Sequence, residues 1–578
     1  MHILGLSCFY HDAAACLLSD GEITAAASEE AFTRIKHDSA FPTNAVRFVL
    51  SQAGISAQQL DAVIFYDKPL RKFDRLLRFQ VATFPHSFSN FVESMPRWIS
   101  TKLRVPKALR EEVDYSGPVL YSEHHLSHAA SAFYCSGFDE AAVLTVDGVG
   151  EWATSSWGVG KGNKLELLGE IRFPHSLGML YSAFTYYCGF KVNSAEYKLM
   201  GLAPYGEPRF VDEIKKLIEI APDGSFRLDM RYFDYDRGER MFNRRFEDLF
   251  GRARRPLDAG EMDDHYKDVA RSIQEVTNEV MVKLARTTLE RTGQTKLAMA
   301  GGVALNCVAN GHILREVGPE DIFIQPAAGD AGGALGAAML AYHGLLDRPR
   351  MPAMRTPFLG QGFSEEEIRE ALDRVGAVYE SLERQDLLDR VAELLDLSHV
   401  VGWYQGRMEW GPRALGHRSI LGDARHPEMR RIINMKIKFR EGFRPFAPTV
   451  LEEHYAEWFD LDRPSPYMML VAPVRTDKPP LPAITHVDGS ARVQTINRQQ
   501  DALYYDLIST FNKRTGCPVV INTSMNVRGE PIVNTPEEAW KCFMRTNMDA
   551  LACGPFLLLK ERQPKLTLRS AEEEFGLD

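Results

Sequence analysis

The sequence predicts an α/β protein with two large domains. Its 578 residues exceed the roughly 250 to 300 at which a single hydrophobic core stops growing. Short apolar segments typical of strands, such as residues 141–146, 296–299 and 321–324, alternate with longer helical patterns such as residues 266–291. Strands and helices interleaved in this way are typical of α/β folds. No internal repeat with a period of about 20 to 50 residues is present, which excludes solenoids and propellers.

The beginning of the chain and its middle define the expected organisation. Residues 2–8, 13–18 and 22–27 predict three strands, the last two joined by a tight turn at Asp20-Gly21. Residues 345–358 contain three prolines in fourteen residues and follow a helix of small residues that ends near Tyr342. We interpret this stretch as a linker and divide the chain into domains 1–350 and 351–578. Helices are expected beyond it at residues 364–375 and 387–395.

Composition excludes several classes of protein. With 45% hydrophobic and 25% charged residues the chain is typical of globular proteins, and its net charge of −10 argues against broad attraction to nucleic acid or anionic membranes. Eight scattered cysteines without a Cys-x-x-Cys pair fit neither a disulfide framework nor a zinc ribbon. No apolar run approaches the roughly 20 residues that cross a bilayer. We therefore expect a cytoplasmic monomer or homodimer, with neither nucleic acid nor membrane as partner.

Two histidines and two aspartates suggest a metal site. His124 and His128 are four residues apart, so on a helix they project from one face and can share one ion, while His125 points elsewhere. A polar helix face is the structural alternative. Asp147 follows the strand at 141–146, and Asp330 lies in a glycine-rich loop. Together these residues would form a mixed nitrogen and oxygen site suited to Fe, Mn or Zn, among which the sequence does not choose.

Three glycine-rich loops that follow predicted strands suit phosphate binding, because bare backbone N–H groups can approach phosphate oxygens there. None is a Walker A or Rossmann motif, and each could be an ordinary tight turn. Strand-ending Asp-Gly turns around an early hairpin suit the ATP cleft of actin/hexokinase-like proteins, where Asp147 and Asp330 could hold a metal at the phosphates. The candidate nucleotide-binding residues are Gly148, Gly301, Gly302, Asn306, Gly329, Gly332 and Gly333.

The second half carries a basic island. Residues 425–444 contain five arginines and two lysines against two glutamates, a local charge of +5, and Arg407, Arg413 and Arg418 precede it. Guanidinium forks bind phosphate and carboxylate bidentately. A solvated basic helix face and a nucleic-acid surface are the alternatives. Aromatic residues and prolines between 438 and 448 favour the rigid wall of a pocket for small anions.

A single histidine, His11, lies in the loop of the first hairpin. A neutral imidazole there could take a proton from a hydroxyl nucleophile. The nearby cysteines, Cys8 and Cys16, are more typical of small buried residues than of nucleophiles.

Seven motifs occur in order over nearly the whole chain. They are His11-Asp-Ala-Ala-Ala15, Glu29-Glu-Ala-Phe-Thr-Arg34, Glu123-His-His-Leu-Ser-His128, Glu196-Tyr-Lys-Leu-Met-Gly201, Trp410-Gly-Pro-Arg-Ala-Leu-Gly-His-Arg-Ser-Ile420, Lys438-x-Arg-Glu-x-x-Arg-Pro-Phe446 and Asn522-Thr-Ser-Met-Asn526. Together they resemble the NodU/CmcH family of O-carbamoyltransferases. One departure is Ala31, where the family has arginine. If that arginine contacts the acceptor in relatives, this enzyme would accept a different molecule. If it only has a surface role, the substitution would carry no information about the acceptor.

The resemblance implies an N-terminal domain with an actin/hexokinase-like (ASKHA, TsaD-like) fold and a YrdC-like α/β C-terminal domain. It implies that ATP and carbamoyl phosphate form carbamoyl adenylate in the C-terminal domain. The N-terminal domain would then pass the carbamoyl group to a hydroxyl of a small natural product. By the same resemblance His124, His128, Asp147 and Asp330 hold a divalent metal, usually Fe(II), with Mg or Mn for the nucleotide, and His11 activates the acceptor.

The resemblance also assigns contacts to carbamoyl phosphate and the adenylate, with Arg492 counted as catalytic. These residues are Lys438, Arg440, Arg444, Arg492, Asn522, Ser524 and Arg528. Three alternatives remain. A tRNA threonylcarbamoyladenosine enzyme uses both domain types. A hydrogenase-maturation carbamoyltransferase also carries Cys-x-x-Cys zinc fingers, which this chain lacks. A non-catalytic actin-like ATP-binding scaffold shares the fold without the reaction.

Overall fold

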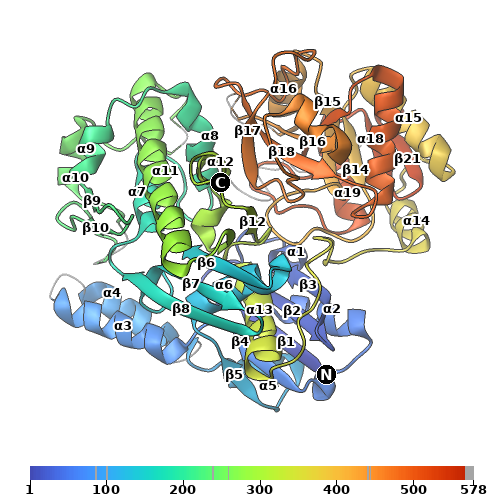
Figure 1. Ribbon diagram of the computed structural model, residues 1–578. Helices are drawn as coiled ribbons and strands as arrows, with labels where there is room; N and C mark the ends of the chain where they lie inside the picture. The colour runs from blue at the N-terminus through green and yellow to red at the C-terminus, as the bar shows by residue number, and fades with distance from the viewer. Residues whose placement is uncertain are drawn as a thin grey trace. The chain divides into compact units, whose positions relative to one another are not determined.

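The computed structural model describes residues 1–84, 88–98, 102–236, 240–257, 259–438, 442 and 444–565. Contacts between Cα atoms divide the chain into two units (Figure 1). The first unit consists of Met1–Glu29 and His37–Met354, and the second of Glu30–Lys36 and the described residues from Arg355 onward. The segment Glu30–Lys36, which contains α1 (Glu30–Thr33), thus belongs to the second unit although its neighbours in the sequence belong to the first. Nothing in the sequence pattern indicated this exchange.

The first unit contains two five-stranded sheets with one topology. Each begins with an antiparallel meander of three strands; a fourth strand then pairs in parallel with the first, and a fifth pairs in parallel with the fourth. The first sheet has the order β3-β2-β1-β4-β5, with β1 His2–Ser7, β2 Ala14–Ser19, β3 Glu22–Ser28, β4 Ala62–Phe65 and β5 Val119–Tyr121. The second has the order β8-β7-β6-β11-β12, with β6 Glu140–Val146, β7 Ala153–Lys161, β8 Lys164–Arg172, β11 Lys296–Ala300 and β12 Asp321–Ile324.

This doubled arrangement is the topology of the actin/hexokinase-like fold, so the predicted fold of the N-terminal domain is confirmed. The three strands predicted near the N-terminus are β1 to β3. Residues Asp20 and Gly21 between the last two both have positive φ, of 50° and 89°, as a tight hairpin turn requires. The repeated unit is longer than the roughly 20 to 50 residues of solenoid and propeller repeats. The duplication was therefore visible only in the strand order.

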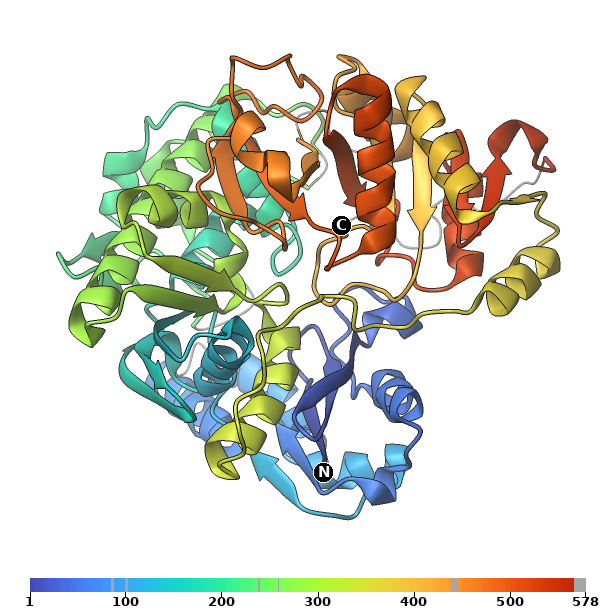
Figure 2. The ribbon, with the colours of Figure 1, turned by 45° about the vertical axis from the view of Figure 1, so that its right-hand side comes forward.

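Two helices lie between the sheets and bring them together. Helix α6 (His124–Ser136) follows the first sheet but packs on β6 and β11 of the second, whereas α13 (Asp330–Met339) follows the second sheet but packs on β1 and β2. Figure 2 shows α13, in yellow-green, between the blue strands of the first sheet and the teal α6. The two helices also contact each other. Their approach needs Gly336, because a Cβ atom there would lie 1.8 Å from the carbonyl oxygen of Ser127.

The other helices of the first unit cover the outer faces, and a two-stranded ribbon accompanies them. Helix α11 is the predicted helix 266–291; it begins after the N-cap Asp263 and ends at Gly293, whose φ is +65°. The elements are α2 Thr43–Ala53, α3 Pro69–Ala82, α4 Phe88–Arg97, α5 Val105–Val113, α7 Leu177–Tyr187, α8 Glu196–Leu202, α9 Val211–Lys215, α10 Arg244–Phe250, α11 Asp264–Thr292, α12 Cys307–Glu316, β9 Ile218–Ile220 and β10 Phe226–Leu228.

The second unit is built on one mixed sheet of nine strands, which confirms its α/β class. The order is β13 (Glu380–Ser381), β21 (Phe556–Leu559), β20 (Ala550–Cys553), β14 (Val401–Tyr404), β15 (Arg418–Asp423), β19 (Val519–Ser524), β16 (Ala447–Leu451), β18 (Ser490–Ile496) and β17 (Leu470–Pro473). The helices are α14 Glu365–Arg374, α15 Arg384–Asp396, α16 Met429–Ile432, α17 Tyr455–Trp458, α18 Ala502–Thr515 and α19 Pro536–Arg545. Helices α14 and α15 are the two predicted after the proline-rich stretch.

The structure also bears on two expectations from the composition, the state of the cysteines and the presence of membrane-spanning helices. All eight cysteines are buried free thiols. Among the helices of the described residues, none is both long and apolar enough to cross a membrane.

Candidate active site

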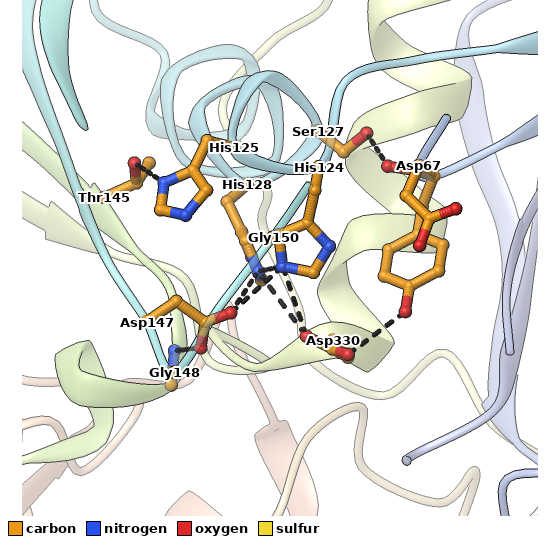
Figure 3. Close-up of polar contacts among 12 residues, drawn as sticks. Asp67, His124, His125, Ser127, His128, Thr145, Asp147, Gly148, Gly150 and Asp330 are labelled. Atoms are coloured by element: carbon orange, nitrogen blue, oxygen red, sulfur yellow. Dashed lines mark hydrogen bonds and ion pairs between the residues drawn. The ribbon is translucent and has the colours of Figure 1, made fainter. Parts of the chain in front are cut away.

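Four polar side chains converge in the first unit. The Nε2 atoms of His124 and His128 lie 3.1 Å apart, and Oδ2 of Asp147 lies 3.0 Å from the first and 3.6 Å from the second. Oδ1 of Asp330 lies 3.6 Å from both nitrogens. Figure 3 shows the two imidazoles from α6 facing both carboxylates, while His125 turns away to bond with Thr145. The structure therefore brings together all four predicted metal ligands.

Backbone geometry fixes each member of the cluster. His124 is the first residue of α6, and its N–H donates to the carboxylate of Glu151 at 3.0 Å. Asp330 is likewise the first residue of α13, and Asp147 directly follows β6. The positive ends of the α6 and α13 helix dipoles therefore lie at the cluster and favour its carboxylates. His128 stands one helical turn beyond His124, which places both rings on one face.

The donor set fits a metal ion. Donor atoms bound at about 2.1 Å to one ion stand about 3.0 to 3.4 Å apart, close to the observed spacings. All four donor atoms lie within 4.8 Å of one another, and all four side chains are buried. Among the described residues, buried Oδ1 of Asp330 has no hydrogen-bond partner, so a lone pair points into the cluster. Two imidazoles with two carboxylates suit Fe, Mn or Zn.

The charge of the cluster also favours a cation. Burial alone lowers the pKa of His128, but the nearby carboxylates of Asp147 and Asp330 outweigh burial and raise that pKa to about 9. Burial raises the pKa of Asp147, and the two histidines reverse this and hold it well below its usual value. The buried carboxylates thus remain ionised and attract positive charge, either a proton on an imidazole or a metal ion.

His11 lies next to this cluster. Its Nε2 is 4.0 Å from Oδ2 of Asp330, and its Nδ1 is 2.9 Å from Oδ2 of Asp12. The other Asp12 oxygen is 2.7 Å from Nδ1 of His37. Asp12 thereby holds His11 with Nε2 toward the cluster. Burial lowers the pKa of His11, but the charges of Asp330 and Asp12 outweigh it and raise that pKa to about 10.

The glycine loops surround the same cluster. Gly302 donates its N–H to Oδ1 of Asp147 at 2.9 Å, and Gly301, with φ of +93°, packs against the carbonyl of Val146. Added Cβ atoms at Gly148 and Gly329 would meet nothing within 4 Å, so these two positions border open space. Backbone at such positions can approach a ligand, and nucleotide binding by these loops stays a prediction.

Packing and capping explain the identity of three other residues that were predicted to bind the nucleotide. A Cβ atom on Gly332 would lie 2.0 Å from the carbonyl oxygen of Ala327, and one on Gly333 would lie 2.7 Å from the ring of Tyr66. Asn306 uses its side chain to cap α12 and to bond with Gln274 at 3.1 Å. These three residues therefore have structural reasons for their identity, independent of any nucleotide.

Several residues of the site escaped the sequence reasoning. Tyr66 donates its hydroxyl to Oδ2 of Asp330 at 3.1 Å, and buried Lys72 lies 2.9 Å from Asp67 and over the rings of Tyr66 and Tyr10. These side chains come from the end of the first sheet and from α3, where no motif drew attention. A tyrosine directly after a buried strand was the one available signal.

In the second unit, predicted anion-binding residues share one face of the sheet. Asn522 donates to Gln494 at 2.8 Å, and Gln494 accepts from Thr449 at 2.7 Å, so these three side chains lie on the same face. Residues two apart on a strand point the same way. Arg492 on β18 and Ser524 on β19 therefore lie on that face as well.

Lys438 joins this group. Its buried Nζ lies 2.7 Å from Oδ1 of Asn526 and 3.3 Å from Oγ of Ser524, so it holds the turn after β19. Arg444 is buried just before β16, and Arg528 lies in the segment between β19 and α19. Arg440 lies outside the described residues. The roles of all these residues toward carbamoyl phosphate stay predictions.

The basic island is less available to ligands than its charge suggested. Arg425 donates to both oxygens of Asp423 and reaches Asp396 at 2.8 Å. Arg418 is fully buried, and it and Arg407 donate to backbone carbonyls. These three arginines are engaged within the unit, and of them only Arg425 belongs to the 425–444 island, whose role as a pocket for small anions stays a prediction. A count of charges does not distinguish paired arginines from free ones.

Comparison with known proteins gives the family. The model of the carbamoyltransferase N-terminus matches residues 2–339, and that of the carbamoyltransferase C-terminus matches residues 392–560. An uncharacterized protein of Synechocystis sp. is 51% identical over the whole length of both chains. The nodulation protein NolNO of Sinorhizobium fredii is 37% identical over 96% of this chain and 79% of its own. Among solved structures, T. kodakarensis HypF is 14% identical, covers 60% of this chain and 48% of its own, and has a TM-score of 0.31. With both halves matched, the chain belongs to the carbamoyltransferase family.

Proposed function

We propose that this carbamoyltransferase makes carbamoyl adenylate from ATP and carbamoyl phosphate and passes its carbamoyl group to a hydroxyl of a small natural product. The observation that carries the proposal is the position of His11, whose Nε2 lies 4.0 Å from Asp330 in a four-donor cluster. The basic residues Arg492 and Lys438 lie in the other unit. An imidazole base beside metal donors, and a separate group of cationic side chains, suit a reaction of two steps.

We assign activation to the second unit, for which the resemblance implies a YrdC-like domain. A carbamoyl oxygen becomes bonded to the α-phosphorus of ATP, and pyrophosphate leaves. The balance of atoms consumes one water and releases the phosphate of carbamoyl phosphate. Arg492 and Ser524 on one sheet face, with Lys438 beside them, would bind phosphate oxygens and offset their charge.

We assign transfer to the first unit. The hydroxyl oxygen of the acceptor attacks the carbamoyl carbon, the bond from that carbon to AMP breaks, and the hydroxyl proton passes to Nε2 of His11. Asp12 holds Nδ1 and so leaves Nε2 as the accepting nitrogen. The residues that would hold a divalent metal are His124, His128, Asp147 and Asp330. Such a cation, when bound, supplies a Lewis acid and offsets the carboxylate charge that raises the pKa of His11.

Exchange of labelled pyrophosphate into ATP tests activation without knowledge of the acceptor. We expect exchange that requires carbamoyl phosphate in the natural protein, and its loss in Arg492→Ala. The matched control is Arg498→Ala, because Arg498 is an exposed arginine of the same unit that pairs with Asp506 at 3.3 Å. Absence of carbamoyl-phosphate-dependent exchange would refute the activation step and favour a non-catalytic ATP-binding scaffold.

The transfer step is tested with His11→Asn. We expect this variant to keep pyrophosphate exchange and to lose transfer of label from carbamoyl phosphate to hydroxylated acceptors, among them sugars, aminocyclitols and macrolides. The control is His312→Asn, because His312 pairs with Glu316 on α12 and is not one of the cluster residues. Equal loss of both half-reactions in His11→Asn would show that the assigned role is wrong. Activity that needs threonine and bicarbonate, with salt-dependent tRNA binding, would indicate tRNA modification instead.

A further inference from the structure

We infer that Arg34, although it lies in the N-terminal part of the sequence, is a positioning residue for the activating site of the second unit. The segment Glu30–Lys36 packs with the second unit. Arg34 directs its side chain from this segment to residues 530–532, in the loop that follows β19. The inference rests on the proposed function, because that function assigns Ser524 and Lys438, which both contact Asn526 of this loop, to the binding of phosphate oxygens.

The guanidinium group of Arg34 clamps this loop with several bonds. Nη1 donates to the carbonyl of Ile532 at 2.7 Å, and Nη2 donates to the carbonyl of Pro531 at 2.9 Å. Nη2 also lies 3.3 Å from Oε1 of Glu530, and Nε lies 3.3 Å from Oε1 of Glu538. Only a planar fork with several fixed donors can serve four acceptors arranged in this way, so lysine would not substitute for it.

The clamp continues from Glu530 to the predicted anion site. Oε2 of Glu530 accepts the N–H of Val527 at 3.0 Å, and its carbonyl accepts from the side-chain amide of Asn526 at 2.7 Å. Oδ1 of Asn526 in turn accepts from Ser524 at 2.8 Å and from Lys438 at 2.7 Å. Arg34 therefore orients, through Glu530 and Asn526, two side chains that we assign to ligand binding.

The backbone of Arg34 gives a second, independent observation. Its φ is +60°, in the left-handed region, and its N–H bonds to the carbonyl of Glu30 at 3.1 Å at the end of α1. Glycine or asparagine adopts this helix-ending conformation readily, whereas other residues adopt it at a cost. The left-handed conformation at the end of α1 therefore gives no reason for an arginine at position 34. Strained residues of this kind cluster at functional sites, and here the contacts of the side chain supply the reason.

The variant Arg34→Gly separates a positioning role from a structural one, because glycine favours the left-handed backbone while the fork is lost. We expect the KM for carbamoyl phosphate in pyrophosphate exchange to rise about tenfold or more, as the loss of an orienting partner commonly does. The KM for ATP should change little, and added guanidinium ion should restore part of the lost activity. The control is Ser398→Gly, a second-unit residue with φ of +63° just after α15.

The outcomes distinguish the inference from the proposed function. If the natural protein shows no exchange, the proposed function fails. If it exchanges and Arg34→Gly behaves like Ser398→Gly, the proposed function stands and the inference is wrong. If Arg34→Gly does not fold, Arg34→Lys decides, because it keeps the charge without the fork: a raised KM supports the inference, and an unchanged KM overturns it.

Discussion

The contact between α6 and α13 offers a test that joins stability to the metal cluster. In Gly336→Ala the new Cβ atom would stand 1.8 Å from the backbone oxygen of Ser127, where real contacts are essentially never shorter than 3.0 Å. The helices must therefore separate by about 1.2 Å. Ser127 lies between His124 and His128, and Asp330 begins the other helix, about 9 Å along the axis from Gly336 at about 1.5 Å per residue.

The expected change in the free energy of unfolding of Gly336→Ala is the difference between two opposing effects. Alanine improves the helix by about 1 kcal/mol, and overpacking against an immobile backbone atom costs about 3 kcal/mol, so the first unit should lose about 2 kcal/mol. With about 2.1 cal/mol/K per residue, its roughly 350 residues give an unfolding entropy near 0.7 kcal/mol/K and a fall in Tm of about 3 °C. Metal ligands tolerate displacements of only about 0.2 Å, so metal affinity should fall at least about tenfold.

Calorimetry and metal analysis by mass spectrometry measure both effects. The control is Gly344→Ala, whose new Cβ atom would meet the ends of two side chains, Leu340 at 3.1 Å and Tyr134 at 3.2 Å, and no backbone atom nearer than 3.9 Å. It should change neither Tm nor bound metal appreciably. If Gly336→Ala raised the Tm and kept its full metal content, the close approach of α6 and α13 would not be what assembles the donor set.

Three further predictions concern other parts of the two units. Asp501 caps α18, and its carboxylate lies 2.9 Å from Nε2 of His417. Asp501→Ala should therefore lower the free energy of unfolding by about 2 kcal/mol at pH 7. The control Ser364→Ala, which removes only a helix cap, should lower it by about 1 kcal/mol. Burial raises the pKa of Asp501, but His417 and the capped amides outweigh burial and hold that pKa low. The stabilisation that Asp501 contributes should therefore be complete above about pH 4 and shrink as the pH falls further. Urea unfolding in which the difference between the natural protein and Asp501→Ala does not shrink on acidification would contradict this. Glu409 accepts three backbone N–H groups at 2.8 to 3.1 Å, so Glu409→Leu should cost about 3 kcal/mol in urea unfolding, and a near-neutral change would show that water replaces the carboxylate. His124→Ala should lose bound metal and transfer together, and normal metal content would refute the ligand set.

The convergence of the four proposed metal ligands was predictable because the information for it is local in the sequence. A spacing of four residues fixes the relative position of His124 and His128 on a helix, and the ends of strands place Asp147 and Asp330 at sheet edges. The residues that support the cluster were not predictable in this way. Tyr66 reaches Asp330 from a segment 264 positions away in the sequence, and no spacing rule links such positions.

The second unit shows the opposite limit. Its arginines were predicted as a group from charge, but charge does not reveal that Arg425 is paired with Asp423 or that Arg418 is buried among carbonyls. The assignment of Arg34 to this unit was equally inaccessible, because a stretch of seven residues packs with a distant part of the chain. Pairings of this kind depend on tertiary contacts, which periodicity and composition do not encode.

The doubled topology explains how one site draws on such distant residues. His124 and Asp330 are the first residues of α6 and α13, which follow the last strands of the two equivalent sheets. His11 and Asp147 lie in the equivalent hairpin loops after β1 and β6. Each sheet therefore contributes one loop residue and one residue at a helix start, and the crossed packing of α6 and α13 brings the four together. Each equivalent pair joins a histidine with an aspartate, so the two halves place different residue types at equivalent positions of one shared site.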